Sequence, residues 1–349
     1  MKSIIISLLL ILSTSCNSQK KKTDTSELDN PEKVATASQI AQYVTNVFED
    51  SKSHLWFGTL EKGIAKYDGN QLKYYTQKDG LPSNRVTGII EDANGIYWLN
   101  TGSGLSKYDG KTFTNFTVKD DFSSNMISNL LIDSKGTFWV GTWGGVFTFD
   151  GKEFKHFPLP YPEVETKINV DTKNWITGIR EDADGNIWIA RDGYGACKYD
   201  GKSFVHFLKK DGLHSNNVTE IEFDEEGNVW FGTRVAERDN PDPEERTGKG
   251  GVNKLVDNEM LSFPEIEAFN NSDVYTIFKD NSGDIWISTI SKGVYRYDGT
   301  QFKNYNIPIA IMDVIIDRKG NVLLGGAGGL YRISPNGTIV NVTQDGPWE

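Results

Sequence analysis

The chain has 349 residues, of which 35 are glycine and 12% are aromatic, and its formal net charge is −11. This composition favours many short strands joined by tight turns, because aromatic residues prefer strands and glycine permits turn conformations. The negative charge argues against a nucleic-acid partner, since phosphate binding needs a basic face and the body of the chain has no stripe of Lys or Arg.

The N-terminal segment has the pattern of a secretion signal. A single cation, Lys2, precedes the apolar run 4–12, and the small residues 13–15 lead to Cys16. The apolar run is too short to span a membrane permanently. Its ending resembles a bacterial lipobox, which predicts removal of residues 1–15 and a lipid anchor on Cys16, placing the protein on a membrane of the cell envelope, outside the cytoplasm. The alternative is an ordinary secretory signal followed by an incidental cysteine.

A polar segment separates the signal from the body of the chain. Residues 16–40 are predicted to form a flexible tether, because their polar composition cannot bury a core. Beyond the tether the only cysteine is Cys197, so no intramolecular disulfide can form there. We expect Cys197 to be a buried packing residue in a strand.

One phrase recurs seven times along the chain, for example IIEDANGIYWLNT at 89–101 and LLIDSKGTFWVGT at 130–142. The aligned large residues are Trp56, Trp98, Trp139, Trp188, Trp230, Trp286 and Leu323, spaced 42, 41, 49, 42, 56 and 37 residues apart. A period near forty with this content predicts the blades of a β-propeller rather than a helical solenoid.

Each repeat divides into four short strands. An apolar alternating run such as 86–92 forms the first strand, a tight turn follows, and the Trp-containing run forms the second. A glycine-containing loop leads to a third strand such as 104–108, and an Asp-Gly turn leads to a fourth such as 113–117. Because neighbouring blades must cover both faces of such a sheet, the Trp is predicted to pack between blades. Turn chemistry best explains the repeated acids Asp50, Asp92, Asp133, Asp182, Asp224, Asp280 and Asp317.

The predicted fold is therefore all-β: a seven-bladed β-propeller of four-stranded antiparallel blades over residues 41–349. The last repeat supplies all four of its own strands, and whether residues 34–42 add a closing strand stays open.

These repeats resemble the two-component regulator propeller family. Its pattern D-x-x-G-x-[LI]-W-[IF]-G-T is followed by G-[LVI]-x-[RK]-[YF]-[DN]-G and by D-G-L-x-[SN]-N, which stands here at 79–84 and 211–216. The resemblance implies a sensor propeller such as those in membrane-spanning histidine kinases, which are often taken to respond to carbohydrates. This sequence shows no second hydrophobic span, kinase segment or DNA-binding helix, so a free-standing, lipid-anchored relative that binds a ligand without phosphotransfer is expected.

The irregular parts of the sequence fall in two classes of loop that emerge on one face of a propeller. The insertion 234–249 lies between a second and a third strand, and the insertion 158–173 lengthens a connection between blades. Long loops on a repeated scaffold are where function tends to lie, although neutral drift in exposed loops remains the alternative.

The chemistry on that face also departs from the repeat. The residues before the first strands are Tyr43, Arg85, Met126, Trp175, Asn217, Asp273 and Ala310. Flat aromatic faces beside planar polar groups suit a sugar or peptide. The predicted ligand-binding residues are Arg85, Trp143, Trp175, Arg191, Tyr194 and Arg234. The competing interpretation is that Trp143 and Trp175 only cover the seams between blades.

Binding is favoured over catalysis. Of the four histidines only His214 belongs to the candidate face, so the sequence shows no histidine pair or metal cluster, and we expect no metal and no cofactor. A propeller lyase or hydrolase is one alternative. The other is a scaffold that binds an envelope protein through 234–249.

Overall fold

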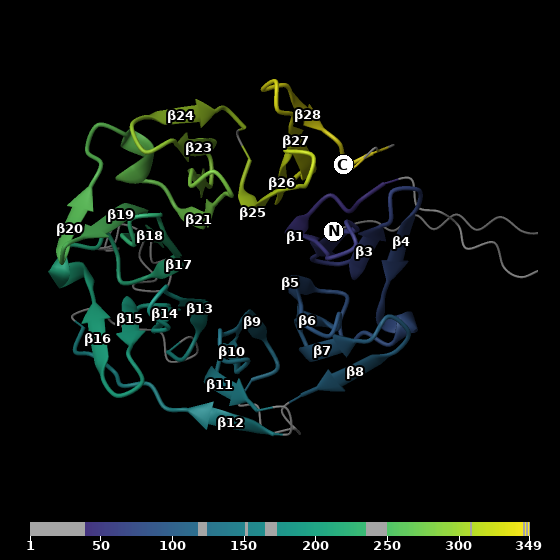
Figure 1. Ribbon diagram of the computed structural model, residues 1–349, viewed down its shortest axis with the longest axis horizontal. Coiled ribbons are helices and arrows are strands. Elements are labelled where there is room, and N and C mark those ends of the chain that lie inside the picture. The colour runs from purple at the N-terminus through teal and green to yellow at the C-terminus, as the bar shows by residue number, and fades with distance from the viewer. Residues whose placement is uncertain are drawn as a thin grey trace, which may run out of the picture. The chain divides into compact units, whose positions relative to one another are not determined.

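The computed structural model describes residues 39–117, 124–150, 153–164, 173–234, 250–307, 309–344, 346 and 348. They belong to one compact unit, Thr36–Glu349, and form seven four-stranded antiparallel sheets arranged around a central channel (Figure 1). The helical segments among the described residues are three short 3-10 turns, η1 (Gln77–Asp79), η4 (Lys209–Asp211) and η6 (Glu267–Phe269). The prediction of an all-β, seven-bladed propeller is confirmed.

Every blade runs from the channel outward in chain order. Blade 1 comprises β1 (Val44–Glu49), β2 (Leu55–Thr59), β3 (Ile64–Tyr67) and β4 (Leu72–Tyr75); blade 2 comprises β5 (Val86–Glu91), β6 (Tyr97–Thr101), β7 (Gly104–Tyr108) and β8 (Phe113–Phe116); blade 3 comprises β9 (Ile127–Ile132), β10 (Phe138–Thr142), β11 (Gly145–Phe149) and β12 (Phe154–Phe157); blade 4 comprises β13 (Ile176–Glu181), β14 (Ile187–Arg191), β15 (Ala196–Tyr199) and β16 (Phe204–Phe207); blade 5 comprises β17 (Val218–Phe223), β18 (Val229–Thr233), β19 (Gly251–Val256) and β20 (Glu259–Ser262); blade 6 comprises β21 (Val274–Lys279), β22 (Ile285–Thr289), β23 (Val294–Tyr297) and β24 (Phe302–Tyr305); blade 7 comprises β25 (Ile311–Ile316), β26 (Val322–Gly326), β27 (Gly329–Ile333) and β28 (Ile339–Asn341).

The repeated Asp and Trp of each blade form one hydrogen-bonded unit. In blade 5, Asp224 accepts the backbone N–H of Asn228 at 2.8 Å, which closes the tight turn, and accepts the indole N–H of Trp230 at 3.1 Å. The same Asp–Trp bond recurs at 2.8–3.0 Å in blades 1, 2, 3, 4 and 6. In blade 7 Leu323 cannot donate, and the amide of Asn321 replaces the indole at 2.8 Å from Asp317. The assignment of these acids to turn chemistry is confirmed.

The Trp side chains also form the core between blades. Trp56 of blade 1 packs with Val86, Ile89 and Leu99 of blade 2. Cys197 is fully buried in the corresponding cluster between blades 3 and 4, as the sequence predicted. Seven such clusters stabilise the ring, because each one covers a face that an isolated blade would expose.

The ring closes by contact between the first and last blades. Strand β1 packs against β25 and β26, and the N–H of Ile40 donates to the carbonyl of Thr343 at 2.8 Å. Residues 39 and 43 pair with 344 and 327 only as isolated bridges. The described residues of the segment 34–42 therefore lie against blade 7 without adding a regular strand, which answers the question that the sequence left open.

Candidate functional site

In six of the seven blades one backbone hydrogen bond joins the two loop positions that the sequence singled out. In blades 2–7 the residue after the second strand donates its N–H to the carbonyl of the residue before the first strand, at 2.9–3.1 Å. The pairs are Gly102 to Arg85, Trp143 to Met126, Asp192 to Trp175, Arg234 to Asn217, Ile290 to Asp273 and Ala327 to Ala310. Both loop classes thus lie at the same end of the channel, as predicted. We call this end the mouth face, and the end with the turns between first and second strands the turn face.

A cavity of about 440 Å³ opens on the mouth face. Four of the six predicted ligand-binding residues line it: Arg85, Trp143, Trp175 and Arg234. They come from blades 2, 3, 4 and 5, so residues 149 positions apart in sequence (234 − 85) contribute to one space. The volume is within the range of small-molecule sites.

The wall of this cavity is a stack of planar groups. The Trp143 and Trp175 rings lie 4.5 Å apart at 25°, and the guanidinium of Arg234 lies 4.7 Å from the centre of the Trp175 ring. An ion pair with the buried Asp192 fixes Arg234 in this position. Such an arrangement limits the rotation of three long side chains before a ligand arrives, which reduces the entropy cost of binding.

The other two predicted residues, Arg191 and Tyr194, do not line the cavity. Arg191 is 2% exposed and Tyr194 is 8% exposed, and the guanidinium of Arg191 lies 4.7 Å from the Tyr194 ring. Arg191 occupies the strand position that Thr holds in blades 1, 2, 3, 5 and 6. Those threonines close the loop after the second strand with a side-chain bond to its backbone, so blade 4 exchanges a loop-closing hydroxyl for a buried cation.

Several lining residues were missed by the sequence reasoning, above all Tyr275 and Met312. They occupy the second position of the first strand, where the hydroxyls of Thr45, Thr87, Ser128, Thr177 and Thr219 donate to a carbonyl of the next blade. Tyr275 and Met312 break this series in blades 6 and 7. The signal that could have found them is present in the sequence, because an alignment of the seven first strands shows five hydroxyl residues and two exceptions.

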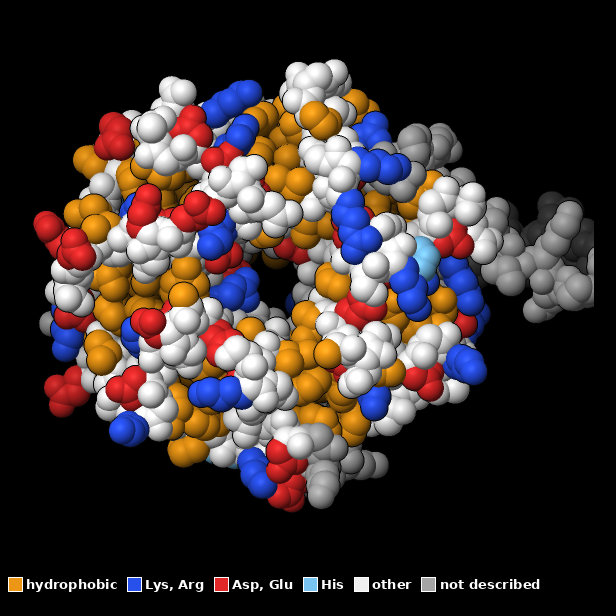
Figure 2. Space-filling view, viewed as in Figure 1, with side chains coloured by type: hydrophobic (Ala, Val, Ile, Leu, Met, Phe, Trp, Pro, Cys, Tyr) orange, Lys and Arg blue, Asp and Glu red, His pale blue; other side chains and the backbone are white. Residues whose placement is uncertain are grey.

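The channel below the cavity contains a group of charged side chains. It has a volume of about 460 Å³, and both positively and negatively charged side chains lie beside the central opening in Figure 2. Arg180 of β13 forms an ion pair with Glu220 of β17 at 2.9 Å. Burial raises the pKa of Glu220 to about 7, against the opposing charge of Arg180. Burial also raises the pKa of Asp313 to about 6, although the N–H of Val47 donates to this carboxylate at 2.9 Å.

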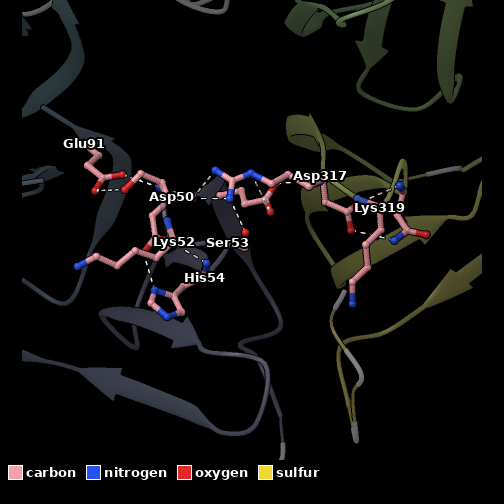
Figure 3. A network of polar contacts seen from close by, with 11 residues as sticks. Asp50, Lys52, Ser53, His54, Glu91, Asp317 and Lys319 are labelled. Carbon is pink, nitrogen blue, oxygen red and sulfur yellow. Dashed lines mark hydrogen bonds and ion pairs between the residues drawn. The ribbon is translucent and has the colours of Figure 1, made fainter. Parts of the chain in front are cut away.

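The charges of the turn face have a different role. Figure 3 shows Asp50 within the turn of blade 1, with His54 Nδ1 at 2.9 Å from Asp50 Oδ2. The carboxylate of Glu91 accepts the backbone N–H of Ser51 at 2.7 Å and thereby joins blades 1 and 2. These carboxylates are occupied by protein donors, so we assign them to stabilising the ring.

His214, the histidine of the candidate face, is held by side chains of blade 5 and of the following connection. Its Nδ1 lies 2.7 Å from Asn253 Oδ1 and its Nε2 lies 3.2 Å from Asn270 Oδ1. Within the described part of the chain, no three His, Cys, Asp or Glu side chains gather as a possible metal site. These contacts explain the position of His214 by packing.

Parts of the predicted site lie outside the described residues. These are 235–249, which is most of the insertion 234–249, and 165–172 of the insertion 158–173, together with the signal 1–15 and Cys16. Among the described residues no helix combines the length and apolarity that a membrane span requires.

Comparison with known families agrees with the blade structure. The family model described as "Two component regulator propeller" matches residues 80–103, 121–144, 212–234 and 268–291. These segments contain the first and second strands of blades 2, 3, 5 and 6. No curated protein sequence matches the chain significantly.

Three solved structures illustrate the range of propellers that this chain is similar to. The extracellular domain of a protein assigned as a hybrid two-component system of B. thetaiotaomicron is 22% identical, with a TM-score of 0.67 over 88% of this chain and 40% of that one. Virginiamycin B lyase from Staphylococcus aureus is 12% identical, with a TM-score of 0.63 over 82% and 95%. PorZ, a surface component of the type-IX secretion system of Porphyromonas gingivalis, is 14% identical, with a TM-score of 0.61 over 83% and 46%. At these identities the likeness shows the fold alone, and the chain spans less than half of the first and third proteins.

Proposed function

We propose, from the match of four of its blades to the two-component regulator propeller model, that the chain is an extracytoplasmic, lipid-anchored propeller that binds a carbohydrate or peptide on its mouth face. The anchor is proposed at Cys16, with the apolar signal before it as support. Mass spectrometry of the N-terminal peptide tests it: acylated Cys16 is expected, and an unmodified Cys16 would contradict it.

One observation carries the binding proposal: the stacked pair Trp143 and Trp175 with Arg234 held over the ring of Trp175. The three side chains border a cavity of about 440 Å³. Stacked tryptophans offer a flat apolar surface to the face of a sugar ring or to an apolar side chain. The guanidiniums of Arg85 and Arg234 supply planar hydrogen-bond donors beside that surface.

The arrangement also supports binding rather than packing alone. Arg234 is fixed by Asp192 from the preceding blade, and Trp143 and Trp175 are only partly buried. Trp56 and Trp230 are examples of residues that only cover a seam between blades, because both are almost fully buried. Pre-organised, partly exposed aromatic groups are what a binding surface requires.

A thermal-shift screen of the full-length protein against oligosaccharides and short peptides tests the function. A ligand present at a hundred times its dissociation constant should raise the unfolding free energy by roughly 2.7 kcal/mol, which is readily detected. Trp175→Ala should abolish the shift, because it removes the ring between Trp143 and Arg234.

Ile290→Ala is the matched control, since Ile290 occupies in blade 6 the register position of Trp143 in blade 3 and does not line the cavity. This control should keep the shift. A ligand whose effect survives in Trp175→Ala would contradict the proposed site. A well-folded protein with no shift for any probe would contradict small-ligand binding and favour the envelope scaffold.

A further inference from the structure

Arg191 is a buried cation for which the described residues supply no carboxylate partner. Its side chain is among the largest fully buried ones, at 2% exposure, and no described carboxylate forms an ion pair with it. One terminal N–H group donates to the carbonyl of Pro160 at 2.7 Å, whereas Nε has no hydrogen-bond partner. An unpaired buried charge costs several kcal/mol, so sequences rarely place one without compensation.

The neighbouring carboxylate is committed elsewhere. Asp192 follows Arg191 directly in the chain but forms its ion pair with Arg234, on the side of the main cavity. Burial lowers the pKa of His206, and the positive charge of Arg191 lowers it further. The Nδ1 atom of His206 is buried without a hydrogen-bond partner.

Two tyrosine rings contact this cation: Tyr194, which is 8% exposed, and the more exposed Tyr161. Arg191 lies 4.8 Å and Lys173 lies 4.7 Å from the centre of the Tyr161 ring. Tyr161 is nevertheless 49% exposed and lies in a connection without regular secondary structure. Its hydroxyl donates to the side-chain oxygen of Asn174. One aromatic ring thus occupies the space beside two cations, where an anionic group would interact more strongly.

We propose that the space held by the Tyr161 ring is a carboxylate-binding subsite centred on Arg191, and that Tyr161 is its replaceable cover. Rotation of the half-exposed tyrosine into solvent uncovers the guanidinium, and Lys173 contributes a second positive charge. A carboxylate then accepts from Nε and a terminal N–H of Arg191 in the bidentate geometry that guanidinium prefers.

The subsite is distinct from the main cavity but connected to it. None of Arg191, Tyr161 and Lys173 lines the cavity. Asn174, which holds the Tyr161 hydroxyl, directly precedes the cavity residue Trp175. Displacement of Tyr161 therefore releases a hydrogen bond next to the stacked tryptophans, so the two spaces can serve two groups of one ligand.

The test uses benzoate and benzamide, which have the same ring but differ in charge. Phenylglyoxal modifies accessible arginines, and peptide mass spectrometry of the full-length protein reports the rate at each one. Tyr161→Ala should raise the modification rate of Arg191. Benzoate at about ten times its dissociation constant should slow that modification about elevenfold, because only the free site reacts, whereas benzamide should not. Benzoate should also bind Tyr161→Ala more tightly than the native protein, which must first displace the cover.

Arg318, half exposed on the turn face, is the internal reference, and its rate should not change with either compound. Arg85 and Arg234 line the main cavity, and their modification rates are measured in the same digest. Failure of benzoate to protect Arg191 alone would contradict the subsite and would leave the proposed function of the main cavity intact. The proposal is overturned if Arg191 reacts no faster in Tyr161→Ala, or if benzamide protects as well as benzoate. Tyr161→Phe keeps the ring and should keep Arg191 slow, which separates the cover from the lost hydroxyl.

Discussion

The two ends of the channel differ in how closely they follow the repeat. On the turn face the same Asp–Trp hydrogen bond recurs in six blades at 2.8–3.1 Å. On the mouth face one hydrogen-bonded position carries Gly102, Trp143, Asp192, Arg234, Ile290 or Ala327. At that position only the backbone bond is repeated, and the side chain differs from blade to blade.

The difference follows from what each position must satisfy. The turn Asp has to accept backbone and indole donors inside a closed turn, so its identity is dictated by unsatisfied donors. The mouth positions are held by their own N–H and carbonyl groups, so the fold of the blade does not dictate which side chain stands there. Repetition therefore identifies the structural end of the propeller, and its absence distinguishes the end at which we propose the ligand site.

The largest expected effect is a loss of stability when a repeated core tryptophan is removed. Trp230 is fully buried between blades 5 and 6, so Trp230→Ala should lower the unfolding free energy by about 3–5 kcal/mol, by loss of buried area and creation of a cavity. Trp143→Ala on the mouth face should cost only about 1 kcal/mol, mainly the stacking with Trp175. Denaturant unfolding of both variants measures the difference.

The same pair separates stability from binding. Trp143→Ala should lose the ligand-induced thermal shift while remaining folded, because its ring borders the cavity. Equal destabilisation by the two substitutions would contradict the division between a structural and a functional end.

The second effect concerns the channel that joins the two ends. The pKa of Glu220 is raised from 4.5 to about 7 by burial, so the folded chain binds this proton more tightly than the unfolded chain. The unfolding free energy should therefore fall as pH rises from about 4.5 to 7, by up to about 1.4 kcal/mol per pH unit. Denaturant unfolding at intervals across this range gives the slope.

Glu220→Gln is the control, because the amide resembles the protonated acid and does not titrate. The two proteins should have similar stabilities near pH 4 and diverge as the pH rises, with a smaller slope left in the variant by Asp313. An unchanged slope in the variant would exclude Glu220 as its source. Below about pH 4 the turn face should act in the opposite direction: despite its burial, Asp50 has a pKa lowered to about 2 by donors such as Trp56, and protonation removes that stabilisation.

The fold could be predicted from sequence because its determinants are local and repeated. The spacing of the Trp residues, the turn Asp and the Asp-Gly turns each specify a short-range structure, and seven copies leave one arrangement that buries both faces of every blade. The closure by residues 39–43 could not be inferred, since it consists of isolated bridges without a strand pattern.

The candidate site was predictable only in part. Register placed Arg85, Trp143, Trp175 and Arg234 at the same end of the channel, and the structure gathers them around one cavity. Register could not show that Arg191 contacts Tyr161 and does not line that cavity, because Tyr161 comes from an irregular connection. The ion pair of Arg180 with Glu220 was missed because each residue interrupts an apolar first strand in a different blade.

The smallest expected effect concerns a single hydrogen bond between neighbouring blades. The hydroxyl of Thr177 donates to the carbonyl of Val218 in the next blade at 2.5 Å. Thr177→Val keeps the shape of the side chain but leaves that carbonyl without this donor, so the unfolding free energy should fall by about 1 kcal/mol. Thr114→Val in the exposed outer strand β8 is the matched control and should change stability by less than about 0.5 kcal/mol. A Thr177 variant as stable as the control would show that packing alone holds the blades together here, and that Tyr275 and Met312 replaced the hydroxyl without cost.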